Sequence, residues 1–155
     1  MAVIGAGGAR QGDEAWTLAE AVGRRLAEAG VALVCGGGGG VMEAASRAAA
    51  EAGGTVIGIV PGESPEDANP YCSHVVATGI GHARNLAVVS SGEAVIAIGG
   101  EWGTLSEIGF ARVIGHEVVA LRSWSLDGRE RMAGGPGVVA AETAEEAVAA
   151  ALAAL

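Results

Sequence analysis

The sequence predicts an α/β fold in which a doubly wound, mainly parallel sheet carries helices on both faces. Three observations support this prediction. Short apolar runs alternate with Ala-rich amphipathic stretches along almost the whole chain, an order that implies parallel strands covered by helices. The apolar runs are nearly continuous, as in strands that are buried on both faces. Glycine-rich turns follow three of these runs, and in parallel sheets such turns share one edge.

Each element is justified by its pattern and by the residues that end it. The first helix has Trp16, Ala19, Val22 and Leu26 on one face, and Gly30 suits its end. Strands are expected at Ala2–Gly5, Val31–Cys35, Thr55–Val60, His74–Thr78, Glu93–Ile98, Glu117–Leu121 and Gly137–Ala140. Helices are expected at Asp13–Ala29, Val41–Ala52, His82–Ser90, Thr104–Gly115 and Thr143–Leu155. The proline-containing segment Pro61–Ser73 is expected to be a loop and Arg122–Pro136 an irregular excursion.

Length and composition favour one domain that spans residues 1–155. Half of the residues are apolar, which is enough for a substantial core, but only 3% are aromatic. Ala, Val, Leu and Ile must therefore build that core. The apolar runs are too short to cross a bilayer, and no basic leader precedes the first strand-like run. The chain is therefore expected to be cytoplasmic and to have no membrane partner.

The charge balance excludes several function classes. A formal net charge of −9 disfavours nucleic acid as a partner, so any anionic ligand must be held by local dipoles and a few arginines. All nine basic residues are arginine, which excludes a Walker-type lysine and a pyridoxal-phosphate Schiff base. No cofactor is expected. Cys35 and Cys72 lack the spacing of metal ligands, so no metal site is expected and both are interpreted as buried reduced thiols.

The three glycine-rich turns, Gly5–Gly8, Gly36–Gly40 and Gly99–Gly103, predict an anion-binding edge in a Rossmann-like nucleotide- or phosphate-binding domain. Glycines let backbone N–H groups close on an anion, and helix dipoles add positive potential there. The first turn resembles the start of a dinucleotide fingerprint, but Arg10 stands where the third glycine belongs. The turn is therefore expected to line a nucleotide pocket through Gly7 and not to form a classical NAD site.

The second and third turns supply most of the candidate ligand-binding residues. Five consecutive glycines each cost roughly 0.5–1 kcal/mol of backbone entropy, which favours close approach by a ligand or by another chain segment. Met42 follows as a core residue or a pocket wall. The residues expected to bind the ligand or its phosphate are Gly7, Gly38, Gly39, Gly40, Met42, Gly99, Gly100, Gly103 and Thr104.

Arg84 and Glu107 are the candidate catalytic residues, and each also has a purely structural interpretation. Arg84 opens a predicted helix, where a cation opposes the dipole unless an anion lies nearby; the alternative is an exposed arginine. Glu107 lies one turn into the next predicted helix. With Thr104 it also fits a capping box, the pattern that recurs in Thr143–Glu146.

The second and third glycine segments resemble the signature segments of the LOG-like proteins. These are Gly36–Ala45 and Gly99–Glu107, and Arg84 matches the helix arginine of that family. The resemblance implies a cytokinin-activating phosphoribohydrolase, which cleaves the N-glycosidic bond of a nucleoside 5′-monophosphate into base and ribose 5-phosphate. It also implies catalytic roles for Arg84 and Glu107, phosphate contacts from Gly99, Gly100, Gly103 and Thr104, and a homodimer or higher homo-oligomer.

Two departures from the LOG-like pattern leave a second function open. Ile98 replaces the family's proline before the glycine pair, and Asn85 replaces the lysine after the arginine. The short form with Ile-Gly-Gly is similar to a branch of molybdenum-cofactor carrier proteins, which implies binding of a pterin phosphate without turnover. A third interpretation is a structural or signalling domain that has no ligand.

Overall fold

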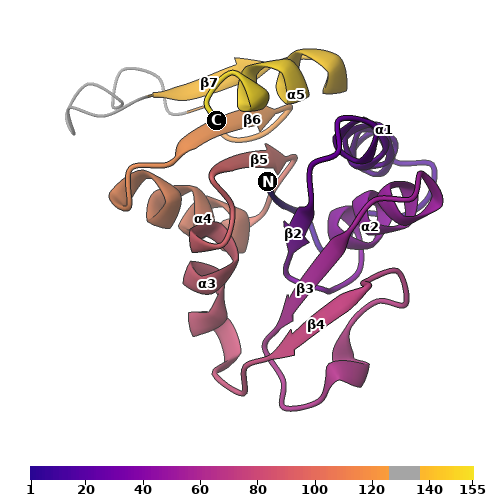
Figure 1. The fold of residues 1–155 in the computed structure, drawn as a ribbon. Helices are drawn as coiled ribbons and strands as arrows, with labels where there is room; N and C mark the ends of the chain where they lie inside the picture. The colour runs from indigo at the N-terminus through magenta and orange to yellow at the C-terminus, as the bar shows by residue number, and fades with distance from the viewer. Residues whose placement is uncertain (126–136) are drawn as a thin grey trace.

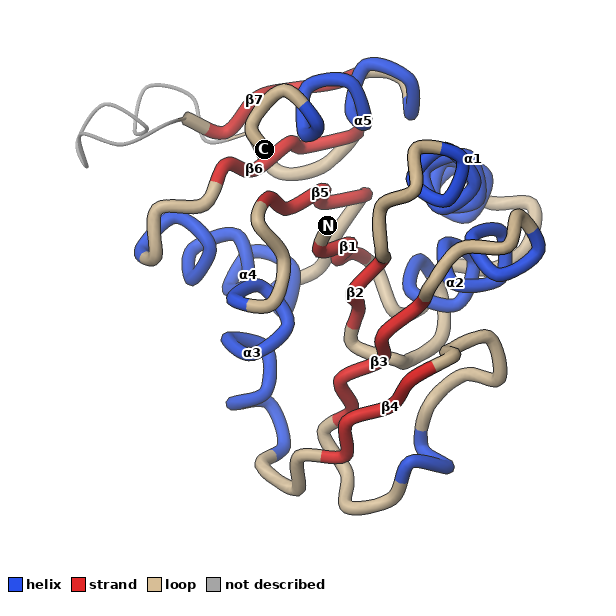
Figure 2. Tube along the Cα trace, viewed as in Figure 1, coloured by secondary structure: helices blue, strands red, loops and turns tan. Residues whose placement is uncertain are grey.

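The computed structural model describes residues 1–125 and 137–155, and it contains one seven-stranded parallel sheet (Figures 1 and 2). The strand order is β4-β3-β2-β1-β5-β6-β7, and every neighbouring pair is parallel. The strands are β1 (Ala2–Gly5), β2 (Leu33–Cys35), β3 (Val56–Val60), β4 (His74–Ala77), β5 (Ala94–Ile98), β6 (Glu117–Leu121) and β7 (Val138–Ala141). The predicted fold class is therefore confirmed.

Helices cover both faces of the sheet (Figure 1). The α-helices are α1 (Glu14–Glu28), α2 (Val41–Glu51), α3 (Arg84–Ser90), α4 (Trp102–Val113) and α5 (Ala144–Leu152). One buried cluster joins α1, α2 and α5 to the sheet, and a second joins α3 and α4 to its other face. Neighbouring strand residues enter opposite clusters, as Cys35 and Val34 do, because side chains alternate across a strand.

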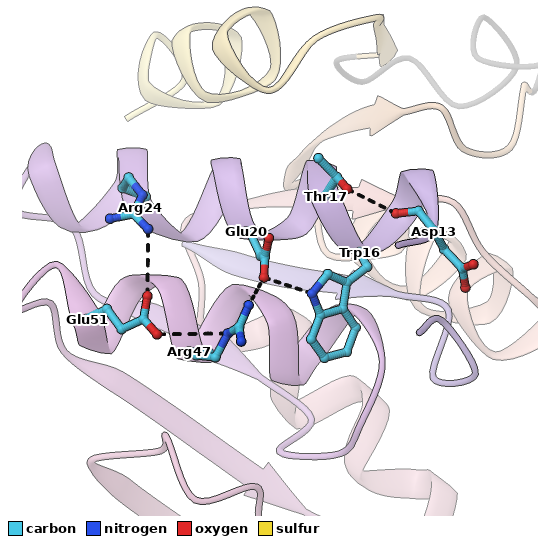
Figure 3. Close-up of polar contacts among 7 residues, drawn as sticks. All are labelled: Asp13, Trp16, Thr17, Glu20, Arg24, Arg47 and Glu51. Carbon is cyan, nitrogen blue, oxygen red and sulfur yellow. Dashed lines mark hydrogen bonds and ion pairs between the residues drawn. The ribbon is translucent and has the colours of Figure 1, made fainter. Parts of the chain in front are cut away.

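Helices α1 and α2 lie side by side and pack closely in a core that has few aromatic residues (Figure 3). A Cβ atom at Gly23 would lie 2.9 Å from Ala45 Cα, so the two helices approach closely only because Gly23 has no side chain. Polar side chains then bridge them. Glu20 accepts hydrogen bonds from Arg47 and, at 2.8 Å, from Trp16 Nε1.

The structure differs from the sequence prediction mainly at element ends. Helix α4 begins at Trp102, two residues before its predicted start. The predicted loop contains a short 3₁₀ turn, Pro65–Asp67, and another, Gly81–Ala83, precedes α3. Most of the predicted excursion, residues 126–136, lies outside the described residues. No helix in the described part is both long and apolar enough to span a membrane.

The strand order fixes where a ligand site belongs. From β1 the chain adds β2, β3 and β4 on one side, and it then returns to place β5 on the other side of β1. Such a reversal leaves a crevice beyond the carboxyl ends of the neighbouring strands. Strands β2, β1 and β5 are the three that precede the glycine-rich turns.

Candidate functional site

The three glycine-rich turns meet at the carboxyl edge of the sheet. Gly40 has a φ of 63° and lies against the first turn, since a Cβ there would be 2.6 Å from the carbonyl carbon of Gly7. A Cβ at Gly8 would lie 3.5 Å from Glu101 Oε1, at the third turn. The expected convergence on one edge is therefore present, and Gly40 is required there by both its backbone conformation and its close contact.

A cavity of about 220 Å³ opens where the turns meet. Six of the predicted site residues line it, namely Gly7, Met42, Arg84, Gly103, Thr104 and Glu107. Helix α4 begins at Trp102, and the first N–H groups of a helix have no intrahelical acceptor. Gly103 and Thr104 carry two of these groups, so the cavity wall includes the positive end of the α4 dipole.

The other predicted glycines lie beside this cavity. Gly99 and Gly100 line a neighbouring hollow with Ser123 and Trp124, and the hydroxyl of Ser123 donates to the carbonyl of Gly99. Gly38, Gly39 and Gly40 form the loop next to Met42 and Glu43 and do not line the cavity. Ligand contacts from these five glycines remain predictions.

Arg84 and Glu107, far apart in the sequence, form an ion pair at the cavity. Arg84 Nη1 lies 3.5 Å from Glu107 Oε1, and their side chains are only 12% and 10% exposed. The same nitrogen donates a 2.8 Å hydrogen bond to Asn85 Oδ1. Arg84 Nε is buried and has no partner among the described residues. The exposed-arginine alternative is therefore wrong.

The guanidinium group of Arg84 packs directly against Gly36. A Cβ atom at Gly36 would lie 2.6 Å from Arg84 Nη1 and 2.7 Å from Cζ. Contacts that short do not occur between ordinary side chains, so any larger residue would displace the guanidinium group from Glu107. Sequence reasoning identified the glycine run but missed this role, because it depends on a residue that arrives from α3.

The environment of Glu107 makes its carboxyl group a weaker acid than an ordinary glutamate. Burial raises the pKa of Glu107 to about 7, against the opposing effect of Arg84. The group therefore changes protonation state near neutral pH, which suits a residue that takes part in acid–base or charge-stabilising chemistry.

The capping-box interpretation of Glu107 is wrong. The N-cap of α4 is Glu101, which puts Thr104 inside the first turn, and no side chain caps that helix. The matching pattern in α5 does form a capping box, with Thr143 accepting from the Glu146 amide and the Glu146 carboxylate bonded back to the Thr143 amide. The same four-residue pattern therefore forms a capping box in α5 but not in α4.

Sequence reasoning gave little weight to three other polar residues of the cavity: His82, Asn85 and Glu101. The signal for Asn85 was its position beside Arg84; no sequence signal placed Glu101 there. No group of three or more potential metal ligands occurs in residues 1–125 and 137–155. Both cysteines are free thiols; Cys35 is buried as predicted, whereas Cys72 is only half-buried.

Residues 1–148 match the sequence pattern of the SLOG cluster4 family. The chain belongs to that family. Two solved structures share its fold over nearly their whole length. They are a molybdenum cofactor binding protein from Rippkaea orientalis (30% identity, TM-score 0.86, 98% of this chain and 94% of that one) and the molybdenum cofactor carrier protein from Chlamydomonas reinhardtii (30% identity, TM-score 0.83, with the same coverage).

A plant enzyme is similar over a shorter stretch. A probable cytokinin riboside 5′-monophosphate phosphoribohydrolase of Oryza sativa subsp. japonica is 39% identical over 90 residues, which are 56% of this chain and 37% of the plant protein. The resemblance to LOG-like proteins is therefore confirmed. Related proteins include both phosphoribohydrolases and molybdenum cofactor carriers, which are two of the three interpretations that the sequence left open.

Proposed function

We propose that this chain is a nucleoside 5′-monophosphate phosphoribohydrolase, which cleaves the N-glycosidic bond to give free base and ribose 5-phosphate. The observation that carries the proposal is the buried Arg84–Glu107 pair beside a cavity whose wall includes the first turn of α4. An anion site and a nearby carboxylate are the two parts that such a reaction needs in one place.

Each part has a defined role in this reaction. The Gly103 and Thr104 amides, the Thr104 hydroxyl and Gly100 hold the phosphate, which orients the ribose at a distance from the bond that breaks. The Gly99 amide already donates to the carbonyl of Leu121, so Gly99 contributes the turn and not a donor. The Glu107 carboxylate then stabilises the positive charge that develops on the ribosyl ring as the base departs.

Arg84 acts on both the carboxylate and the ligand. Its charge lowers the pKa of Glu107 and so favours the ionised form. Its guanidinium donors bind the ligand, and its placement depends on Gly36 and Asn85. Because only the ionised Glu107 stabilises the ribosyl cation, kcat/KM should fall as the pH falls below about 7.

The direct test is incubation with AMP and with N6-prenyl-AMP, followed by chromatography for the free base. Glu107→Gln keeps the shape of the side chain and removes its charge, so base release should fall by roughly 100-fold or more. The matched control is Glu28→Gln, which changes an exposed carboxylate at the far end of α1 and should release base at the wild-type rate. Equal base release by the Glu107→Gln protein would refute the assignment.

A carrier of a phosphorylated ligand such as a pterin phosphate is the second candidate. It is favoured by the full-length similarity to molybdenum cofactor proteins and by the departures at Ile98 and Asn85. A carrier would bind AMP or co-purify with a pterin and release no base. A domain without a ligand would show no thermal shift with any mononucleotide, whereas a bound ligand raises stability according to its concentration and Kd.

We also propose that the chain acts in the cytoplasm as a homodimer or higher homo-oligomer of one nucleotide- or phosphate-binding domain spanning residues 1–155. Helix α4 supports the self-association, because it leaves large apolar side chains in solvent. Trp102 is 77% exposed and Val113 is 84% exposed, while Phe110 lies between them. Light scattering should show a mass above that of the monomer, and Val113→Asp should reduce it.

A further inference from the structure

Two thiols that the proposed reaction does not use lie next to each other beneath the Gly36–Gly40 loop. Cys35 ends β2 and pairs in register with Gly58 of β3. A Cβ atom at Gly58 would be 2.7 Å from the sulfur of Cys72. The Cys72 sulfur therefore occupies the space beside Cys35 that a larger residue at position 58 would fill.

The core clusters confirm that the two sulfurs are on the same face of the sheet. Cys35 belongs to the cluster beneath α1 and α2, and Cys72 packs against that cluster. Ile57 and Ile59 enter the opposite cluster, so Gly58, which lies between them, faces Cys35 and Cys72. Contact with the Cys72 thiol is also the main reason that the pKa of Cys35 falls to about 7.

Both sulfurs contact groups that hold the loop in place. The Gly37 amide donates to Cys35 Sγ at 3.4 Å. The Asn69 side-chain amide donates a hydrogen bond to the carbonyl of Gly38 at 3.1 Å. The Cys72 thiol in turn donates to Asn69 Oδ1 at 3.6 Å. A change in either thiol therefore alters a contact that fixes the backbone of the loop next to Arg84.

We propose that Cys35 and Cys72 are a reversible dithiol–disulfide pair that controls the conformation of the Gly36–Gly40 loop. The oxidant is a small-molecule disulfide. The neighbouring Cys35 thiolate raises the pKa of Cys72, so the half-buried Cys72 attacks while passing its proton to Cys35, which forms a mixed disulfide and expels one thiolate. Cys35 then loses that proton, attacks the Cys72 sulfur as a thiolate and expels the second. The protein loses two electrons and two protons, and the small disulfide gains them as two thiols.

The bridge weakens one of the contacts that anchor the loop and removes another. A Cys35 sulfur bonded to Cys72 is a poorer acceptor for the Gly37 amide, and the oxidised Cys72 no longer has a proton for Asn69. The loop should therefore open more often in the oxidised protein, and its amides should exchange roughly fivefold faster, as expected for the loss of about one hydrogen bond.

The test is equilibration of the folded protein in glutathione buffers of stepped redox ratio, followed by acid quenching, alkylation and intact mass measurement. The expected product is a monomer that has lost two hydrogens, has no alkylatable thiol and is restored by dithiothreitol. Persistence of two free thiols at the most oxidising ratio, or a glutathione adduct as the end product, would overturn the proposal. This outcome does not depend on ligand binding, so it is independent of the proposed hydrolase activity.

Matched variants separate the bridge from general oxidation. Cys35→Ala should accumulate a glutathione adduct at Cys72, whereas Cys72→Ser should leave the buried Cys35 reduced. Hydrogen exchange of the peptide covering residues 36–40 then tests the link to the loop. It should quicken on oxidation in the wild type and stay unchanged in Cys72→Ser. Equal exchange in oxidised and reduced wild type would overturn the control of the loop.

Discussion

Two of the arginine–glutamate pairs in the described residues differ in what surrounds them. On the α1–α2 face, Arg47 bonds to Glu20, which also accepts from Trp16 Nε1, while Arg47 Nε lies 4.0 Å from Glu51 (Figure 3). At the carboxyl edge of the sheet, Arg84 faces Glu107 at 3.5 Å beside a cavity, and its Nε has no partner among the described residues. The Nε atoms of both arginines are buried and have no hydrogen-bond partner among the described residues, so the two pairs differ in the cavity that only Arg84 and Glu107 line.

Exposure adds to the contrast. The Arg47 and Glu20 side chains are 27% and 29% exposed, whereas those of Arg84 and Glu107 are 12% and 10% exposed. Burying a charged pair is expensive unless other bonds compensate. The Arg84–Glu107 pair is therefore a poor way to stabilise a fold and a good way to prepare a charged site for a ligand. The difference teaches that such pairs should be judged by their burial and by the space beside them, and not by their presence.

Replacing each arginine in turn by alanine tests whether the two pairs have different roles. Arg84→Ala should reduce base release from AMP by roughly 100-fold or more, because it removes the cation at the cavity. Arg47→Ala should leave base release unchanged and lower the unfolding free energy by about 1 kcal/mol. Chromatographic assay and urea unfolding measure the two effects. A loss of activity in the Arg47→Ala protein matching that in Arg84→Ala would erase the distinction.

The sequence was sufficient to predict the parallel sheet and the edge where the site lies. The apolar runs fixed the strands, and each glycine-rich turn had to follow a strand, so Gly7, Gly40 and Gly103 were expected close together. Those inferences are local or topological. They require only the order of the elements.

What the sequence could not predict depends on contacts between distant segments. Nothing local links Gly36 to Arg84, or Cys35 to Cys72, because each contact is created by a neighbouring strand or helix. The start of α4 was misplaced for a related reason. Thr104 is a good N-cap residue and Gly103 a poor helix former, yet the helix begins at Trp102. The sequence pattern of a cap was present without its geometry.

The second prediction concerns stability and pH at Glu107. Its folded pKa, about 7, is above the ordinary value of 4.5, so the unfolded chain loses its proton first as the pH rises. The folded state then binds more protons, and wild-type stability falls between pH 4.5 and about 7. Glu107→Gln lacks this loss. Its stability relative to wild type should therefore rise by roughly 2–3 kcal/mol between pH 4.5 and pH 8.

Urea unfolding at several pH values measures this difference. Glu28→Gln, at an exposed position, is the control and should follow the wild-type pH dependence. If the difference in unfolding free energy between the Glu107→Gln and wild-type proteins is constant across this pH range, the pKa of the carboxyl group is not raised. The pKa would then give no support to Glu107 as the reacting group.

The smallest expected effects come from replacing the threonine of each Thr-x-x-Glu pattern, Thr143 or Thr104, by valine. Thr143→Val removes the hydroxyl that accepts from the Glu146 amide, so unfolding free energy should fall by about 1 kcal/mol with ligand binding unchanged. Thr104→Val keeps the shape of a buried side chain that caps no helix. It should weaken AMP binding by roughly fivefold through the lost hydroxyl. Calorimetric titration with AMP and thermal unfolding of both variants distinguish the two roles. If Thr104→Val loses stability as Thr143→Val does and still binds AMP normally, then both patterns are structural, and the α4 terminus has no part in holding a phosphate.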